Sequence, residues 1–139
     1  MTGPDVRHAV PSDVDAVLRC RREAAEGTGI TDDRDGVAGL ISRDPAALLL
    51  AERDGRITGT VTAGFDGWRC SAYRFAVHPG FRRQGIATAL MDAAERRLLA
   101  PGGRRIDAMV LESNDRAHRT WGAAGYHRED HRRRWIKSL

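Results

Sequence analysis

The sequence has few cysteines and no long apolar run. Its 139 residues include two cysteines, Cys20 and Cys70, which are too few for a disulfide framework or a cysteine metal site. No apolar stretch approaches the roughly 18 residues that cross a bilayer. The start, Met-Thr-Gly-Pro-Asp, has neither the basic segment nor the apolar run of a secretory signal. The sequence therefore predicts a cytoplasmic protein with reduced thiols, no membrane partner and no metal.

Lysine is almost absent as well: Lys137 is the only one, so arginine carries nearly all of the positive charge. The net charge is +4, with 41% hydrophobic and 30% charged residues, which predicts one folded domain over residues 1–139. A basic balance suits either nucleic acid or a phosphorylated ligand. The charged segment 127–137 is either a patch for an acidic partner, with Trp135 stacking on bases, or a solvated terminal strand. We favour the solvated strand.

The periodicity of apolar residues predicts alternating strands and helices. Ser12 and Asp15 resemble a capping box at the start of the first helix, whose apolar stripe runs to Ala25 before a break at 27–29. The order fits an α/β (α+β) fold with a mixed central sheet. The expected strands are 6–10, 48–53, 57–65, 71–77, 105–111 and one or more in 126–136, and the expected helices are 14–25, 33–42, 86–99 and 114–123.

Residues 75–91 contain the most informative motif in the sequence. A strand ends at Pro79, a helix starts near Ala87, and the sequence Arg-Arg-Gln-Gly-Ile-Ala lies between them. Gly85 lets the backbone approach a ligand closely. Free N–H groups at a helix start, beside Arg82 and Arg83, form an anion site that suits a phosphate or pyrophosphate. The alternative is a plain connection with solvated arginines.

This stretch resembles a family signature. Arg82-x-x-Gly85-x-Ala87 is similar to the Q/R-x-x-G-x-G/A loop of the GNAT superfamily of N-acetyltransferases. Downstream, Asn114-x-x-Ala117-x-x-x-Trp121-x-x-x-Gly-Tyr resembles a second segment of the same family, although many members have tyrosine where Trp121 stands. Residues 59–73 look like the subgroup named after YpeA. The resemblance covers residues 5–128 and implies a mixed central sheet of six to seven strands flanked by about four helices.

The resemblance also implies a cofactor site for acetyl-CoA as cosubstrate. The pantetheine arm would pair with the strand at Phe75 and Val77, where a backbone N–H would stabilise the oxyanion. Asn114 would bind the arm, cap the following helix, or do both. Trp121 would pack near the acetyl end, and the loop 26–35 would help to select the substrate. The residues implied to wrap the pyrophosphate are Arg82, Arg83, Gln84, Gly85, Ile86 and Ala87.

Transfer to an amine needs a base, because a lysine-like amine with a pKa near 10.4 arrives protonated. Glu112 is our choice for it, although a carboxylate there also suits the start of a helix. His78 is more typical of a turn, and Glu52 and Asp66 are further candidates. Trp121 has no proton to give to a thiolate, so the usual general-acid role is vacant. Tyr73 is a weak candidate for that acid, and strand parity, which puts it on the face of Phe75, suits a core residue equally well.

The sequence as a whole predicts an N-acetyltransferase that moves the acetyl group directly within a ternary complex, since no cysteine stands in the matched motifs. The acceptor would be a small-molecule amine or a protein amine. A non-catalytic acyl-CoA-binding module is the first alternative, and the vacant tyrosine position supports it. A basic nucleic-acid-binding domain is the second and rests on charge alone. The resemblance also implies a possible homodimer through the C-terminal segment.

Overall fold

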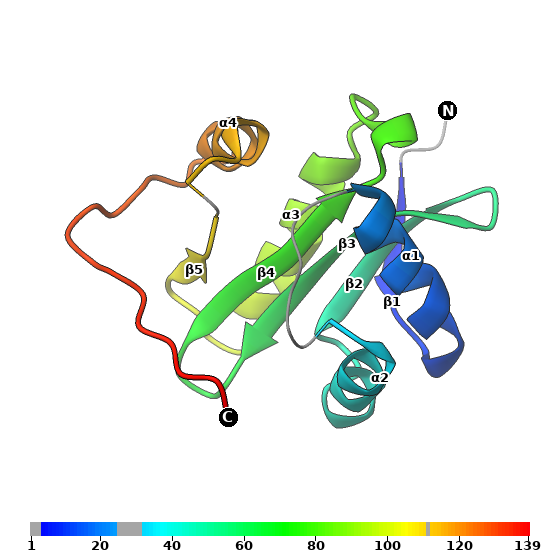
Figure 1. Cartoon of the computed structure of the whole chain (residues 1–139), viewed down its shortest axis with the longest axis horizontal. Coiled ribbons are helices and arrows are strands. Elements are labelled where there is room, and N and C mark those ends of the chain that lie inside the picture. The colour runs from blue at the N-terminus through cyan, green and yellow to red at the C-terminus, as the bar shows by residue number, and fades with distance from the viewer. Residues whose placement is uncertain (1–3, 25–31, 111) are drawn as a thin grey trace. The chain divides into compact units, whose positions relative to one another are not determined.

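The computed structural model describes residues 4–24, 32–110 and 112–139. The chain divides into two compact units, Met1–Met109 and Val110–Leu139. The first unit contains a sheet with helices on both faces (Figure 1). The described elements in chain order are β1 (Asp5–His8), the 3-10 helix η1 (Pro11–Asp13), α1 (Val14–Ala24), α2 (Arg34–Arg43), β2 (Leu48–Arg53), β3 (Arg56–Phe65), β4 (Cys70–Val77), the 3-10 helix η2 (Pro79–Phe81), α3 (Ile86–Leu99), β5 (Ile106–Ala108) and α4 (Asp115–Ala123).

The sheet is mixed, as the sequence predicts, but smaller than the family resemblance implies. Among the described residues it has five strands in the order β1-β2-β3-β4-β5, rather than six to seven. The first four are antiparallel neighbours, and β5 pairs parallel with β4. The crossover through α3 is long enough for this parallel pairing. The four α-helices among the described residues agree with the predicted number.

The alternation of side chains along the strands gives the sheet two apolar faces. On one face, Leu49, Val61 and neighbouring residues pack against the buried stripe of α3. On the other face, Leu48 and Leu50 pack against α1 and α2. The stripe of α3 runs through Ile86, Leu90, Met91, Ala94 and Leu98, close to the predicted one.

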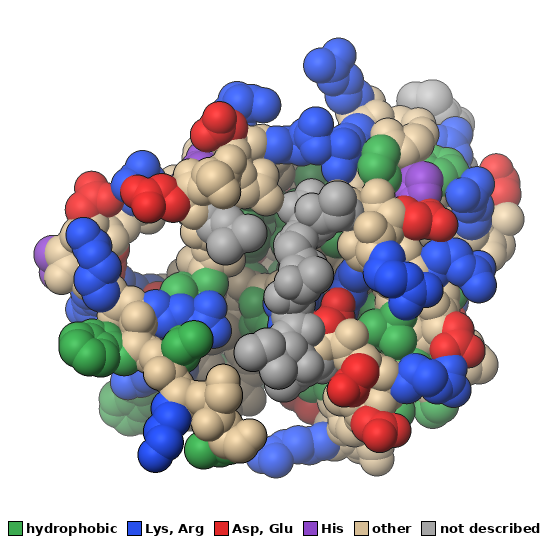
Figure 2. Space-filling view, viewed as in Figure 1, with side chains coloured by type: hydrophobic (Ala, Val, Ile, Leu, Met, Phe, Trp, Pro, Cys, Tyr) green, Lys and Arg blue, Asp and Glu red, His purple; other side chains and the backbone are tan. Residues whose placement is uncertain are grey.

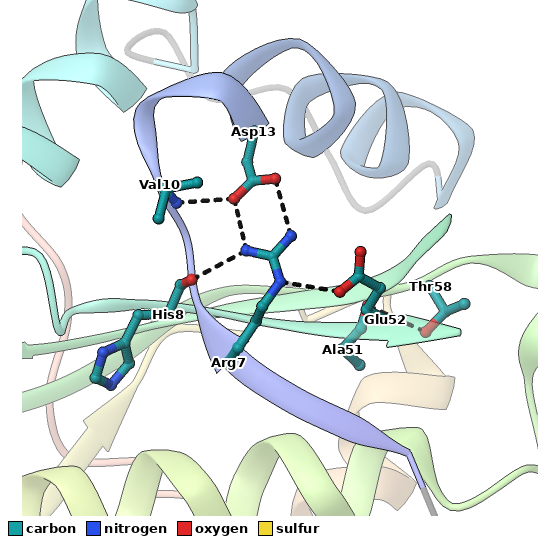
Figure 3. A network of polar contacts seen from close by, with 7 residues as sticks. All are labelled: Arg7, His8, Val10, Asp13, Ala51, Glu52 and Thr58. Carbon is teal, nitrogen blue, oxygen red and sulfur yellow. Dashed lines mark hydrogen bonds and ion pairs between the residues drawn. The ribbon is translucent and has the colours of Figure 1, made fainter. Parts of the chain in front are cut away.

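A polar network fixes the start of α1 to the sheet (Figure 3). Arg7 on β1 donates from Nη1 and Nη2 to the Asp13 carboxylate at 2.8 and 3.0 Å, and from Nε to Glu52 Oε2 at 2.9 Å. Asp13 also accepts from the Val10 N–H at 2.8 Å. The hydrogen bonds from Arg7 and Val10 lower the pKa of Asp13, and those to Asp13 and Glu52 raise the pKa of Arg7. The side chain that hydrogen-bonds the backbone at this helix start is therefore that of Asp13, rather than a side chain of the predicted Ser12–Asp15 pair.

Gly59 lets α3 approach the sheet closely. A Cβ at this position would lie 2.9 Å from Leu90 Cδ1, and 3.0 Å from both Ile86 Cγ2 and the Ala76 carbonyl oxygen. We expect Gly59→Ala to lower the free energy of unfolding by about 1–3 kcal/mol, because overpacking shifts α3 or the strand. Gly39→Ala on α2 is the control, since no described atom outside its own helix backbone and adjoining residues lies within 4 Å of its Cβ position. Urea denaturation measures both variants, and equal stability of the two would contradict this packing.

The second unit contains α4 and then residues without regular secondary structure. The prediction of a strand within 126–136 is wrong. Apolar residues do not alternate there with polar ones, and Trp135 and Ile136 are adjacent and exposed by 93% and 74%. A strand in this segment would have no apolar face to bury. What forms instead is a turn after α4, in which the Tyr126 N–H donates to the Trp121 carbonyl at 3.1 Å.

The remaining expectations concern a shorter strand, residues outside the described ranges, and membrane-spanning helices. The expected strand 105–111 pairs only over Ile106–Ala108, and Met109 is exposed. Ala25, the break at 27–29, most of the loop 26–35, and Leu111 lie outside the described residues. No helix in the described ranges has the length and apolar character needed to cross a membrane.

Candidate functional site

The turn before α3 has an open helix N-terminus. Gly85 precedes the helix with φ +79°, in the left-handed region, and no side chain caps this end. The first bond of the helix runs from the Ala89 N–H to the Gly85 carbonyl at 3.0 Å, so the N–H groups of residues 86–88 precede the helical ladder. Apart from the adjoining residues, no atom of the described part of the chain lies within 4 Å of a Cβ built on Gly85. The geometry therefore leaves space for an anion against the backbone.

Basic side chains surround this turn. Arg83 is exposed and has φ +64°, an unusual conformation for a residue with a side chain. Arg82 is half-buried, and its Nη2 donates to the Ala24 carbonyl at 3.5 Å. Gln84 accepts a hydrogen bond from Arg53, at the end of β2. The structure thus brings residues 82–87 together in one turn and adds Arg53, which local sequence reasoning could not place there.

A β-bulge interrupts β4 just before this turn. Thr62 pairs with Tyr73 and Thr60 pairs with Ala76, so Val61 lies opposite both Arg74 and Phe75. Arg74 has φ +53°. The extra residue reverses the side-chain alternation beyond it, and the expectation that Tyr73 and Phe75 share a face is wrong.

The two aromatic side chains instead lie on opposite faces of the sheet. Phe75 packs with the cluster under α3. Tyr73 is exposed by 40% and lies beside Gly64, on the face that α1 covers. Tyr73 is therefore not a core residue.

Beyond the bulge, β4 runs past its parallel neighbour. The pairing with β5 covers only Cys70–Ala72, and the last pair is Ala72 with Ala108. The strand continues through Val77 to the turn before α3. The end of β4 beyond Ala72 therefore leads from the bulge to the open helix N-terminus.

His78 has the turn role that the sequence favours. Its Nδ1 accepts the Gly80 N–H at 3.0 Å, which leaves Nε2 to carry the proton of the neutral ring. Nε2 lies 2.6 Å from Oε2 of Glu23 near the end of α1. Neither nitrogen of this ring is left to act as a base while both bonds are formed. The partner, Glu23, could not be found from the sequence, because the two residues are 55 positions apart.

Both cysteines are buried, at two places in the first unit. Burial raises the pKa of the Cys20 thiol to about 11, so it is protonated near neutral pH. Cys70 belongs to the core cluster under α3. Neither environment favours the thiolate that a nucleophilic cysteine needs. Within the described residues, no three His, Cys, Asp or Glu side chains gather in a way that could hold a metal ion.

The second unit contains three of the candidate site residues. The Asn114 side chain accepts the Ala117 N–H at 3.1 Å, so it caps α4 as one of its two expected roles requires. Glu112 is exposed, and its carbonyl lies 3.0 Å from Nε2 of His118. The Trp121 ring meets Tyr126 edge-on, with centroids 4.7 Å apart. All of these contacts are formed within the second unit. The roles of the three residues toward a cofactor therefore stay predictions.

Two arginines beside the bulge were missed by the sequence interpretation. Arg21 is buried on α1, and Arg74 lies in the bulge itself. A signal existed for Arg21, because it follows Val14, Val17 and Leu18 at helical spacing and so occupies the buried stripe. No comparable signal marks Arg74, since a bulge depends on the partner strand.

Charges of both signs lie on the face of the protein that Figure 2 shows. On the face shown in Figure 2, acidic side chains (red) are interspersed among the lysine and arginine side chains (blue). A nucleic-acid-binding face is expected to carry a continuous basic stripe. This view offers no support for the nucleic-acid interpretation.

The chain resembles a known protein family and curated proteins in its sequence. A model of the acetyltransferase (GNAT) family matches residues 15–126. The chain is 48% identical over 75 residues to an acetyltransferase of Pectobacterium atrosepticum, which is 54% of this chain and 53% of that protein. It therefore spans about half the length of the curated relatives it matches.

Two solved structures share the fold. The PaiA N-acetyltransferase from Thermoplasma acidophilum in complex with coenzyme A has a TM-score of 0.82 and 16% identity, covering 93% of this chain and 92% of that one. AAC(6')-Iy in complex with the bisubstrate analogue CoA-S-monomethyl-acetylneamine has a TM-score of 0.76 and 19% identity, covering 99% of this chain and 100% of that one. At these identities, the likeness is one of fold.

Proposed function

The chain belongs to the acetyltransferase (GNAT) family, and from this premise we propose that it transfers an acetyl group from acetyl-CoA to an amine. The observation that carries the proposal is the open N-terminus of α3, where the left-handed Gly85 leaves space against uncapped N–H groups. Arg82 and Arg83 beside it fit the negative charge of a pyrophosphate. A cytoplasmic location, a homodimer and membership of the YpeA-like subgroup stay predictions.

Residues of the first unit supply the proposed binding surface. The turn 82–87 would bind the pyrophosphate, with Gln84 held by Arg53. The end of β4 around Phe75 and Val77 would lie along the pantetheine arm, between that turn and the bulge. Backbone N–H groups at the bulge would stabilise the oxyanion, a contribution of about 3–4 kcal/mol for one such donor. Asn114 and Trp121, on or beside α4, are the proposed contacts from the second unit.

The proposed reaction is direct transfer in a ternary complex. The neutral amine nitrogen attacks the thioester carbonyl carbon, a C–N bond forms and the C–S bond breaks. The sulfur leaves with the bonding electron pair, and the proton of the amine passes to a base. A cysteine acyl-enzyme is disfavoured by the raised pKa of Cys20 and by the core position of Cys70. The products are an N-acetylated amine and coenzyme A.

Glu112 is the proposed base, because its carboxylate is exposed and free to meet water or an amine. Tyr73 is the proposed candidate for the general acid, and the bulge places it beside Arg74 on the face that α1 covers, with its ring partly exposed. A thiol has a pKa near 8.5, so the leaving thiolate can also take its proton from water. Trp121 would pack at the acetyl end without giving a proton.

Arg83→Gly tests the charge at the turn without straining the backbone. Glycine suits the φ of +64° at this position, so we expect stability to be kept or raised by up to about 1 kcal/mol. We expect affinity for coenzyme A to fall about three- to fivefold, because an exposed charge contact contributes up to about 1 kcal/mol. Calorimetric titration measures the affinity at low and high salt, and the difference from the unmodified protein should shrink as salt rises.

Arg104→Gly is the matched control, since this exposed arginine lies just beyond the opposite end of α3. An equal loss of affinity in both variants would mean that only the overall charge matters. That result would argue against a pyrophosphate contact at Arg83.

A non-catalytic acyl-CoA-binding module is the second candidate function, favoured by Trp121 in place of the family's usual tyrosine. Release of free thiol from acetyl-CoA in the presence of an amine panel separates the two. The enzyme proposal expects thiol release that depends on both the amine and the protein. Tight binding of coenzyme A without turnover on any amine would favour the module, and Trp121→Tyr would then be the variant to test for gain of activity.

A further inference from the structure

Arg21 carries a positive charge into the interior, next to the bulge of β4. It is 7% exposed, on the face of α1 that covers the sheet. Its Nη1 donates to Asp32 Oδ1 at 2.6 Å, and its Nε and Nη2 lie 3.5 and 3.4 Å from the hydroxyls of Thr60 and Thr62. Burying a guanidinium is costly unless it is paired and hydrogen-bonded, and here one carboxylate and two hydroxyls meet that need.

A second arginine, Arg74, lies in the bulge next to the Thr60 hydroxyl that Arg21 contacts. The Thr60 hydroxyl accepts from Arg21 Nε and donates to the Arg74 carbonyl at 3.4 Å, so it links the buried arginine to the bulge. Burial lowers the pKa of Arg21, and the positive charge of Arg74 adds to that effect. Arg74 is half-buried, and no carboxylate pairs with it among the residues that the structure describes.

The Arg74 guanidinium is therefore the charge at the bulge that has no carboxylate partner among the described residues. Of the two charged groups that act on Arg21, Arg74 is positive and Asp32 is negative, and Asp32 pairs with Arg21 itself. The Glu23 carboxylate is held at the His78 ring, with Oε2 2.6 Å from Nε2. A half-buried arginine attracts an anion more strongly than an exposed one does, because the local dielectric is lower. The same field repels an acceptor that carries several positive charges.

The proposed transfer takes place at this point of the strand. The face of β4 under α3 is filled by Phe75 and Val77, which pack on the core. The opposite face holds the partly exposed Tyr73 and the buried guanidinium of Arg21. An acceptor that reaches the bulge on that face has its amine at the reacting carbonyl and its other groups near the two arginines.

We propose that the acceptor is a small amine that also carries a carboxylate, an amino acid in the broad sense, whose carboxylate pairs with Arg74 in front of the buried Arg21. This inference rests on the proposed function, because it names the substrate class of the same site. A bidentate arginine–carboxylate pair would hold the molecule by the group that is not acetylated and orient its amine. Polyamines and aminoglycosides are poor acceptors on this account.

The test compares amines that differ only in the carboxylate. Each standard α-amino acid is assayed beside its carboxamide, together with spermidine, kanamycin and phosphoethanolamine, by thiol release from acetyl-CoA. We expect at least one amino acid to be turned over with kcat/KM about tenfold or more above that of its carboxamide. Calorimetric titration of the coenzyme A-loaded protein with the same pairs gives a readout that does not need turnover.

Arg74→Asn tests the assignment, because asparagine tolerates the left-handed backbone while the charge is removed. We expect it to raise KM for the amino acid about tenfold and to leave KM for the carboxamide nearly unchanged. Arg69→Asn is the control, since this exposed arginine lies on the same hairpin, in the turn before β4, and its loss should not change the preference.

The possible outcomes test the acceptor assignment separately from the proposed transferase function. Turnover without a preference for the carboxylate, or a preference that survives in Arg74→Asn, overturns the acceptor assignment and leaves the transferase proposal intact. Preference for phosphoethanolamine or a polycation also overturns it. Binding of coenzyme A with neither binding nor turnover of any amino acid does the same. Failure to bind coenzyme A or acetyl-CoA refutes the proposed function itself.

Discussion

Gly85→Asn is expected to weaken binding of coenzyme A at least about tenfold, a loss of about 1.4 kcal/mol, while the protein stays folded. Asparagine is among the residues that accept the left-handed conformation, so the φ of +79° can be kept. A Cβ at this position has no described atom outside the adjoining residues within 4 Å, so the new side chain would fill the open space at this turn. It would therefore exclude the pyrophosphate rather than damage the fold.

Gly55→Asn provides a matched control for this prediction. Gly55 lies in the turn between β2 and β3 and has φ +75°, and among the described residues no atom beyond its chain neighbours lies within 4 Å of its Cβ position. Both variants should lose similar stability, about 1 kcal/mol or less, because each places a side chain in the left-handed region. Only Gly85→Asn should lose affinity in a calorimetric titration. Undiminished affinity in Gly85→Asn would place the cofactor elsewhere.

Asp13→Asn is expected to lower the free energy of unfolding by about 2–3 kcal/mol, the largest stability effect that we predict. The carboxylate receives two hydrogen bonds from Arg7 and one from the Val10 N–H, and it is largely buried. Hydrogen bonds to a charged group contribute about 1.5–3 kcal/mol, and the amide keeps only part of this network while Arg7 loses its counter-charge. Chemical denaturation near neutral pH measures the loss.

The same carboxylate gives the protein a defined acid sensitivity. Arg7 and Val10 lower the pKa of Asp13 in the folded state below its ordinary value of 3.8. Its stabilising contribution is therefore complete above the pKa of the unfolded chain and is lost as pH falls through the lower folded value. The stability difference between the unmodified protein and Asp13→Asn should shrink below about pH 4. A difference that stays constant down to pH 2 would contradict this account of Asp13.

Local signals in the sequence predicted most of the first unit. The turn residues Asp54-Gly55 and the alternation along β3 define a hairpin within a few residues, and α3 has one continuous apolar stripe. These features depend on neighbours in the chain. The turn 82–87 was predicted as an anion site for the same reason, since glycine and arginine at a helix start act through nearby backbone.

The features that sequence reasoning missed depend on residues far apart in the chain. The bulge at Arg74 arises from the register between β3 and β4, and counting alternate residues along one strand cannot detect it. The partner of His78 on α1 is 55 residues away. The strand expected within 126–136 does not form, because its residues lack an apolar face that a sheet could bury.

Calorimetric titration of the protein with coenzyme A, and then with acetyl-CoA, decides whether the turn 82–87 binds the cofactor. We expect saturable binding of both ligands at one site with micromolar dissociation constants, weakened in Gly85→Asn and unchanged in Gly55→Asn. Absence of saturable binding for either ligand would contradict the assignment of the turn 82–87 as the cofactor site.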